Sequence, residues 1–294
     1  MGPVVVGGVG GSGTRVVAEI LLAAGVDLGN DLSRELDDLW FNLLFYRPAW
    51  LEDVLADDRA RAALPGLSLM HKRAHGMLQL TSAEWTFVRS ACRDAFASGY
   101  FSGRRVARTR RLRSAWVARR VARFLRAGLV RRNHRAWGWK EPISHLLAPA
   151  VLRTFGGARY VHVIRHGLDM AFSGNRRQVR RFAPLLGLHT GAGLPQPTDI
   201  LRFWVQANRR VLDVVVPLAP SQVHVIKFED LCSRPAIELD HLLTFLGISV
   251  GPAQFARLCA VPRTPDSSGR FRTQDLAVFP RSDLDEVERL GFRI

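Results

Sequence analysis

The sequence predicts an α/β fold of three layers, in which a mostly parallel central sheet is flanked by helices. Three short apolar runs, residues 3–9, 159–164 and 223–228, have the length and β-branched composition of buried strands. Segments with apolar residues at helical spacing alternate with these runs. Strands that alternate with helices are typical of parallel sheets covered on both faces.

The composition is that of a globular protein with a sizeable core. Of 294 residues, 47% are hydrophobic and 23% are charged, so neither disorder nor a fibrous structure is indicated. Because no linker is long or polar enough to mark a boundary, we predict one domain over residues 1–294. No apolar run reaches the ~20 residues of a membrane helix, and no basic region precedes the first apolar stretch. We therefore expect a cytoplasmic location.

The first strand leads into a glycine-rich turn and a helix. Apolar residues recur at helical spacing over residues 15–24, and the helix is expected to end at Gly25. In this order of elements, the N–H groups of the turn and of the first helical turn can point at a bound anion. The predicted binding residues are Gly10, Gly11, Ser12, Gly13, Thr14 and Arg15.

The glycine turn differs from two familiar nucleotide-binding motifs. A Walker A loop has a lysine after its last glycine, whereas Thr14 and Arg15 follow Gly13 here. The dinucleotide fingerprint needs an acidic residue at the end of a second strand, and none is found at the expected spacing. An ordinary glycine turn is the plain alternative, but the flanking strand and helix favour phosphate binding.

Residues 31–135 predict a largely helical insertion that is rich in arginine. The net charge is +16, and the stretch 104–135 holds thirteen arginines and no acidic residue. Such asymmetry indicates a contact with anionic ligands, nucleic acid or acidic lipid. A genome rich in G and C, which favours Arg over Lys on solvated faces, explains it equally well.

The second half of the chain predicts further strands and helices. Residues 137–142 predict a short strand that ends at a proline, and helices are expected at 168–181, 198–216 and 235–246. Arg165 leaves the carboxyl end of the strand at 159–164, where ligands of open α/β sheets bind. Ser173 lies eight residues later on the expected helix. The pair could hold one phosphate from two sides; a strand-capping arginine and an ordinary helix serine are the alternative.

These two segments together resemble bacterial-type sulfotransferases that use 3′-phosphoadenosine 5′-phosphosulfate (PAPS). Three further segments resemble the same family: residues 227–231 with 245–247, Trp204 with Asn208, and residues 268–270. The resemblance covers residues 3–25 and 137–272 in pieces. It implies a P-loop-like sulfotransferase fold and transfer of a sulfuryl group from PAPS to a hydroxyl or amine.

The resemblance also assigns parts of the cofactor site. It implies that the glycine turn holds the 5′-phosphosulfate and that Arg165 and Ser173 hold the 3′-phosphate. Gly269 and Arg270 would belong to the loop that closes over that phosphate. No metal is expected, because the sequence has no DxD-type cluster and the family needs no metal.

Sulfuryl transfer requires stabilisation of charge on the leaving oxygen. The family usually carries Lys or Arg just before its Ser-Gly-Thr, where this chain has Gly11. Arg15 or Lys140 could supply that charge. Binding of a different anion and loss of activity are the alternatives.

The acceptor also needs a base within hydrogen-bond reach. Asp31 is the first candidate, because it lies at nearly the offset of the glutamate base in the protein-tyrosine branch of the family. Glu141 is the second candidate, and His71 and His75 are further ones, since other branches use histidine.

Two other functions compete with sulfuryl transfer, a P-loop phosphotransferase and a nucleic-acid-binding protein. A P-loop phosphotransferase would need the missing lysine and a magnesium aspartate, and a nucleic-acid-binding protein using 104–135 would need a recognised binding fold. We expect the acceptor to be a small molecule, a glycan or a glycolipid, and an acidic acceptor would suit the arginine-rich stretch. That stretch could also contact a membrane surface. We do not expect nucleic acid as a partner.

Overall fold

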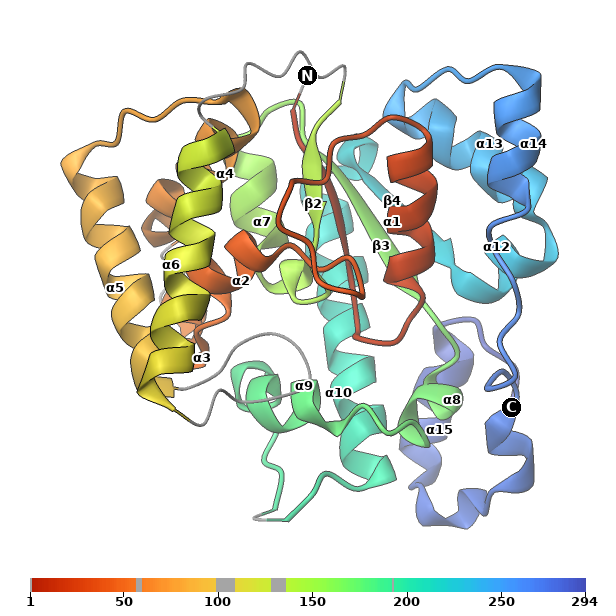
Figure 1. Ribbon diagram of the computed structural model, residues 1–294. Helices are drawn as coiled ribbons and strands as arrows, with labels where there is room; N and C mark the ends of the chain where they lie inside the picture. Colours follow the sequence, from red (N-terminus) through yellow and green to blue (C-terminus); the bar gives the residue numbers. More distant parts are fainter. Residues whose placement is uncertain (1, 57–59, 99–108, 128–135, 192) are drawn as a thin grey trace.

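The computed structural model describes residues 2–56, 60–98, 109–127, 136–191 and 193–294. Within these ranges one parallel sheet has the strand order β2-β1-β3-β4 (Figure 1). Its strands are β1 (Val4–Gly8), β2 (Gly138–Lys140), β3 (Arg159–Ile164) and β4 (Val223–Lys227). Helices flank the sheet, so the predicted fold class is confirmed.

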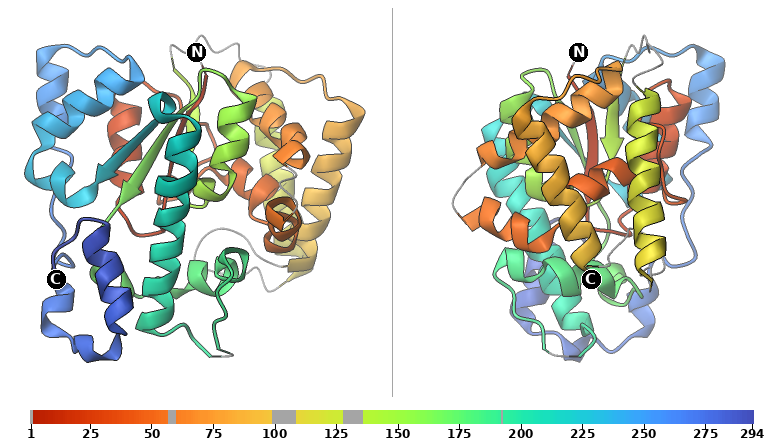
Figure 2. Two further views of the ribbon diagram at one scale, coloured as in Figure 1. Left: turned by 180° about the vertical axis from the view of Figure 1, so that it is seen from behind. Right: turned by 60° about the vertical axis from the view of Figure 1, so that its left-hand side comes forward.

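Alternate residues of the strands face two separate cores. Val4 and Val6 of β1 belong to a cluster with α1 (Thr14–Ala23), α13 (Pro235–Leu246) and α14 (Pro252–Cys259). Val5, between them, belongs to a second cluster with α7 (Ser144–Thr154) and α10 (Pro197–Arg209). The views from behind and from the side show these helices on opposite faces of the sheet (Figure 2). This alternation is the period-2 pattern of a strand buried on both sides.

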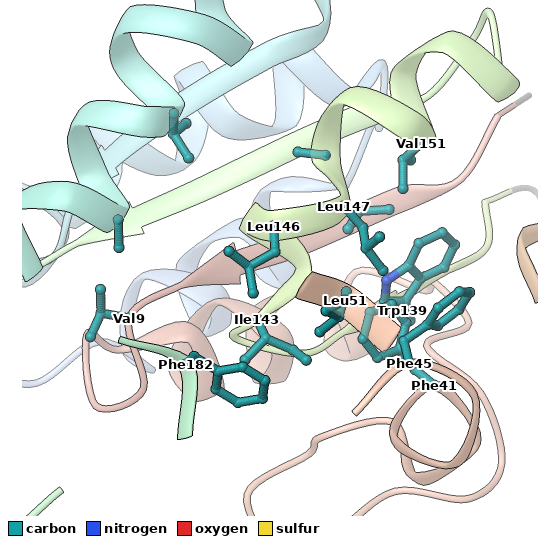
Figure 3. Close-up of a cluster of buried hydrophobic side chains, with 14 of the residues drawn as sticks. Val9, Phe41, Phe45, Leu51, Trp139, Ile143, Leu146, Leu147, Val151 and Phe182 are labelled. Atoms are coloured by element: carbon teal, nitrogen blue, oxygen red, sulfur yellow. The ribbon is translucent and has the colours of Figure 1, made fainter. Parts of the chain in front are cut away.

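The described part of residues 31–135 is largely helical and packs beside the sheet at β2 (Figures 1 and 2). Its helices are α2 (Leu39–Phe45), α3 (Pro48–Ala56), α4 (Leu64–His75), α5 (Ser82–Ser98) and α6 (Arg110–Ala127). Phe41 and Phe45 of α2 lie beside Trp139 of β2 (Figure 3), with ring centroids of Phe41 and Trp139 6.0 Å apart. The apolar cluster therefore runs without a break from these helices to the sheet.

Two predicted helices are interrupted in the structure. The expected helix at 168–181 is divided into α8 (Gly167–Ala171) and α9 (Arg176–Phe182). Between them, Asn175 Nδ2 donates a hydrogen bond to the oxygen of Gly10, a contact that an unbroken helix would not make. The expected helix at 198–216 ends as α10, and a π-helical segment (Arg210–Val215) and the short α11 (Val216–Leu218) follow it.

The remaining helices are short. They are α12 (Phe228–Ser233), α15 (Arg281–Arg289) and the 3-10 segments Ala60–Ala63, Pro184–Leu186, Pro220–Gln222, Arg270–Thr273 and Leu276–Val278. Within the described ranges, no helix combines the length and the apolar character needed to cross a membrane. Cys92, Cys232 and Cys259 are free thiols.

A buried ion pair fixes the start of α2. Asp38 accepts hydrogen bonds from the N–H groups of Trp40 and Phe41, both at 2.9 Å, and from Arg73 Nη1 at 2.8 Å. Asp38 is fully buried, and the side chain of Arg73 is only 5% exposed. Because removal of one partner leaves an uncompensated buried charge, we predict that Asp38→Ala lowers the free energy of unfolding by about 3–5 kcal/mol.

Denaturant unfolding measures this change, and Arg281→Ala is the control. Arg281 pairs with Asp285 while its side chain is 73% exposed, so its loss should have an effect of about 0–1 kcal/mol. Equal effects of the two substitutions would contradict the role of Asp38.

Candidate active site

The parallel strands bring four chain segments to one edge of the sheet. Gly8 pairs with Val163 of β3, Lys140 with Val6 of β1, and Lys227 with Ile164. A cavity of about 630 Å³ lies at this carboxyl edge. Residues that directly follow β1, β2 and β4 contribute to its wall, as expected for a ligand site of an open α/β sheet.

The glycine turn forms part of this wall and has a backbone that needs glycine. Gly11 and Gly13 have φ angles of +100° and +97°, which favour glycine. A Cβ on Gly13 would also lie 2.2 Å from the ring of Phe228. A side chain at position 11 would therefore be strained in this conformation of the turn.

Some donors of the turn are used inside the protein and others are not. The Gly10 N–H donates to Gln178 Oε1 at 2.5 Å, and the Ser12 N–H donates to the oxygen of Val9 at 2.9 Å. Within the described residues, no hydrogen bond engages the N–H of Gly11 or Gly13, and the buried Ser12 Oγ has no partner. The first N–H groups of α1 also lack partners within the helix. This set of donors suits an oxyanion.

Arg165 lies beside a loop from the C-terminal part of the chain. Its Nη2 donates to Ser267 Oγ at 2.9 Å, and its guanidinium lies 5.6 Å from the ring centroid of Phe228. Its Nε is buried and has no partner among the described residues. Since Phe228 also lines the cavity and packs on Gly13, Arg165 and the glycine turn contact the same ring.

The C-terminal loop is held against α8. Asp169 Oδ2 accepts a hydrogen bond from the Gly269 N–H at 2.8 Å, and Arg270 Nη1 donates to the oxygen of Phe172 at 3.3 Å. These contacts bring the predicted residues Gly269 and Arg270 to the Arg165 region. Ser173 lies at the break after α8, where its Oγ accepts from the Asn175 N–H at 3.4 Å. The prediction that Ser173 lies on a helix is wrong, because α8 ends at Ala171 and α9 begins at Arg176.

Motif residues outside the cavity position Arg165. Trp204 Nε1 donates to the oxygen of Arg165 at 2.9 Å, and Glu229 Oε1 accepts from the N–H of His166 at 2.9 Å. A Cβ on Gly167 would lie 2.7 Å from the Trp204 ring, so only glycine allows this close packing. The segments at 204–208 and 227–231 therefore support the turn that follows β3.

Lys140 and Glu141 both line the cavity at the end of β2, and both are buried. Lys140 Nζ donates to the oxygen of Glu35 at 3.0 Å and pairs with Asp37. Burial raises the pKa of Glu141 well above the usual glutamate range, and the charge of Asp37 raises it further against the attraction of Lys140. Burial also raises the pKa of Asp37. The cavity thus holds two carboxyl groups whose affinity for protons is raised.

Asp31 and the two histidine candidates do not line the cavity. The Asp31 carboxylate lies 3.2 Å from Arg120 Nε and 2.8 Å from Arg123 Nη1, and it is buried. Because two guanidinium groups already pair with the Asp31 carboxylate, this geometry does not favour Asp31 as the base. His71 and His75 pack on each other, with ring centroids 4.3 Å apart.

The arginines that line the cavity include one that the sequence predicts and two that it does not. The exposed Arg15 lines the cavity, as predicted for a binding residue, and pairs with Glu19 at 3.3 Å. Two further arginines, Arg177 and Arg263, also line it, together with Gln178. They lie on segments far apart in the chain, and no local pattern marks them.

The arginine-rich stretch is described only in part, and residues 104–108 and 128–135 lie outside the described ranges. Arg120 and Arg123 turn toward Asp31, and Arg113 Nη1 donates to the oxygen of Phe96 at 2.8 Å. The exposed arginines of α6 with described side chains are Arg111, Arg119 and Arg126. Among the described residues, no group of three or more His, Cys, Asp or Glu side chains could hold a metal ion.

The raised pKa of Glu141 predicts how stability depends on pH. The folded chain holds the Glu141 proton more tightly than the unfolded chain. The stability contributed by this group is therefore lost as the pH rises from the unfolded value of about 4.3 through the raised folded pKa. We predict that Glu141→Gln unfolds at a higher temperature than the parent chain, by a margin that grows with pH over this window.

Thermal unfolding at a series of pH values tests this prediction, with the exposed Glu52→Gln as the matched control. The control should follow the parent chain at every pH. A margin for Glu141→Gln that does not change with pH would show that ionisation of this buried group does not destabilise the fold.

Comparison with known proteins agrees with this architecture. A family model described as the sulfotransferase family matches residues 3–252. The sulfotransferase domain from the curacin biosynthetic pathway is 15% identical, with 100% of this chain and 98% of that chain covered and a TM-score of 0.50. The sulfotransferase domain of the Synechococcus PCC 7002 olefin synthase is 15% identical, with 100% and 96% covered and a TM-score of 0.47. A comparison with curated proteins finds no match. Because the family match spans most of its length, the chain belongs to the sulfotransferase family.

Proposed function

We propose that the chain transfers the sulfuryl group of PAPS to a hydroxyl or amine of an acceptor. One observation carries this proposal: a glycine turn with unengaged N–H groups, the buried Arg165 and the buried Glu141 follow β1, β3 and β2 at the same edge of the sheet, and the turn and Glu141 line its cavity. The first two suit an anionic nucleotide with phosphates at two positions. The carboxyl group suits removal of a proton from the acceptor.

The donor nucleotide would contact both anion-binding regions. The 5′-phosphosulfate would bind the turn at residues 10–14, and the 3′-phosphate would bind Arg165 near Gly269 and Arg270. Ser12 Oγ and Arg165 Nε support this fit, because both are buried polar atoms without partners among the described residues. A buried donor left unpaired is unfavourable, and an anion would satisfy it.

In the proposed reaction, the bond from the acceptor oxygen or nitrogen to sulfur forms as the bond from sulfur to the 5′-phosphate oxygen breaks. The acceptor proton passes to the Glu141 carboxylate, and 3′,5′-adenosine bisphosphate leaves with the electron pair of the broken bond, and so a negative charge, on its 5′-phosphate oxygen. Lys140, Arg15, Arg177 and Arg263 line the same cavity and would stabilise that charge. Asp37 holds Lys140 in place through their ion pair.

Two observations weigh against the rival functions. The turn has Arg15 after Thr14 and no Walker lysine, which disfavours a P-loop phosphotransferase. On α6, Arg120 and Arg123 neutralise Asp31 inside the protein, so less charge is left for nucleic acid than the sequence indicates. The exposed arginines of α6 remain available for an acidic acceptor or a membrane surface.

Calorimetric binding of 3′,5′-adenosine bisphosphate tests the function directly. We expect it to bind more tightly than 5′-AMP and ATP at the same moderate salt concentration, because only it carries the 3′-phosphate. Equal affinity for the three nucleotides would overturn the sulfotransferase assignment.

Arg165→Ala should weaken binding of 3′,5′-adenosine bisphosphate by about 1.5–3 kcal/mol, the range of a hydrogen bond to a charged group. This corresponds to a factor of about 10–150 in Kd. Binding of 5′-AMP should change little. Arg202→Ala is the matched control, because Arg202 pairs with Asp283 and does not line the cavity. Unchanged affinity in Arg165→Ala would remove this residue from the 3′-phosphate site.

A further inference from the structure

Two amide side chains hold the backbone of Gly10 in the glycine turn. Gln178 Oε1 accepts a hydrogen bond from the Gly10 N–H at 2.5 Å, and Asn175 Nδ2 donates to the Gly10 oxygen at 2.5 Å. A Cβ on Gly10 would lie 2.6 Å from Gln178 Oε1 and 2.8 Å from Asn175 Nδ2, so a side chain at this position would displace both amides. Asn175 and Gln178 therefore form an amide clamp on the turn.

The bond from Asn175 fixes the direction of the next N–H group. The Gly10 oxygen and the Gly11 N–H belong to one trans peptide, in which these two groups point in opposite directions. Because Asn175 holds the oxygen, the Gly11 N–H points to the other side, and no hydrogen bond engages it within the described residues. A peptide between two glycines turns over easily, since neither residue has a Cβ that restricts φ and ψ. Without Asn175, the Gly11 N–H would have no fixed direction.

Gln178 has a second polar group that the clamp does not use. The Gly10 N–H requires the amide oxygen as its acceptor, which leaves Gln178 Nε2 as a donor. Gln178 is only 6% exposed, and its Nε2 is buried without a partner among the described residues. Gln178 and Gly11 line the same cavity. A buried donor without a partner is unfavourable, and an anion in the cavity would satisfy it.

The clamp lies on a segment that is anchored in the core and also contacts the second proposed phosphate region. Phe182, near the end of α9, is fully buried, and its ring centroid lies 4.7 Å from that of Tyr46. The Asn175 N–H donates to Ser173 Oγ at 3.4 Å. The connection between α8 and α9 therefore holds the glycine turn and also contains the serine expected at the 3′-phosphate.

We propose that Asn175 is a positioning residue that directs the Gly11 N–H at the 5′-phosphosulfate, and that Gln178 both holds the turn and donates a hydrogen bond to the same group. The identity of this ligand rests on the proposed function. The sequence alone indicated neither residue, because they lie 165 and 168 positions from the glycine that they hold.

Calorimetry on the full chain with three nucleotides tests the clamp. Asn175→Ala removes the donor at an exposed position, and Gln178→Met removes both polar groups of the amide at similar volume. We expect each variant to bind 5′-AMP and 3′,5′-adenosine bisphosphate about tenfold more weakly or worse, as for the loss of a hydrogen bond to a charged group. Binding of adenosine 3′-monophosphate should change little, because this nucleotide has no 5′-phosphate. General damage to the fold would weaken all three nucleotides alike.

Gln222→Ala is the matched control. Gln222 Nε2 also donates to backbone oxygens, those of Gly156 and Ala158, both at 3.0 Å. These residues precede β3, at the edge of the sheet opposite the cavity, and Gln222 does not line the cavity. This variant should bind all three nucleotides as the parent chain does.

Nuclear magnetic resonance reports the state of the peptide directly. When glycine is labelled with ¹³C at its carbonyl and ¹⁵N at its amide, a carbonyl-correlated spectrum shows only the glycines that follow another glycine, namely Gly8, Gly11 and Gly157. In the parent chain, 5′-AMP should move the Gly11 signal and leave the Gly157 signal in place. In Asn175→Ala, the Gly11 signal should be displaced before nucleotide is added and should respond less to it. In Gln222→Ala, the Gly157 signal should be displaced instead, and Gly11 should respond as in the parent.

The outcomes separate this inference from the proposed function. If both clamp variants bind 5′-AMP as tightly as the parent, or lose all three nucleotides equally, the positioning role is overturned; a preference of the parent for the 3′-phosphate would still support the sulfotransferase function. If the parent shows no such preference but the clamp variants lose 5′-AMP selectively, the proposed function fails. The clamp then stands as part of a site for another phosphate ligand.

Discussion

The parallel pairing of β1 with β2 and β3 brings together groups that are far apart in the chain. The glycine turn follows β1, Lys140 and Glu141 end and follow β2, and Arg165 follows β3. Reversal of any one strand would move its terminal residues to the opposite edge, about the length of a strand away. Two cores hold this alignment, because Val4 and Val6 pack on one layer of helices and Val5 on the other.

Charge is buried at the end of β2, and the surrounding groups compensate it only in part. Lys140 is paired with Asp37, whereas Glu141 Oε2 has no hydrogen-bond partner among the described residues. An isolated buried carboxylate is unfavourable. Because Glu141 lacks a full set of hydrogen-bond donors, its burial raises its pKa. A carboxyl group so placed is poorly explained by stability. Groups with perturbed pKa values cluster at functional sites, which fits the role proposed for Glu141 as the acceptor of a proton.

Local pattern was enough to predict the strands at 159–164 and 223–228, the glycine turn and the helix at 235–246, because each depends on neighbouring residues. The break between α8 and α9 was not predictable, since the Asn175–Gly10 bond joins residues 165 positions apart. The same holds for Asp31, whose partner Arg123 is 92 positions away. Nothing near Asp31 in the sequence shows that its carboxylate is occupied, so spacing alone made it the first candidate for the base. Glu141, the second candidate, lies in the strand segment predicted at 137–142, and it lines the cavity.

The proposed nucleotide site and the helices beside it come from different parts of the chain. The segments that surround the proposed nucleotide site follow the strands or come from residues 263–271, and their contacts leave little freedom: Gly13 packs on Phe228, and Trp204 holds Arg165. The helices α2 to α6 pack beside the sheet at β2 (Figure 1), and the family match spans them as well. The two parts meet at Tyr46, which follows α2 and lines the cavity at the sheet edge. Substitutions near Tyr46 can therefore change one wall of the cavity while the glycine turn keeps its geometry, as expected where a rigid scaffold positions variable segments.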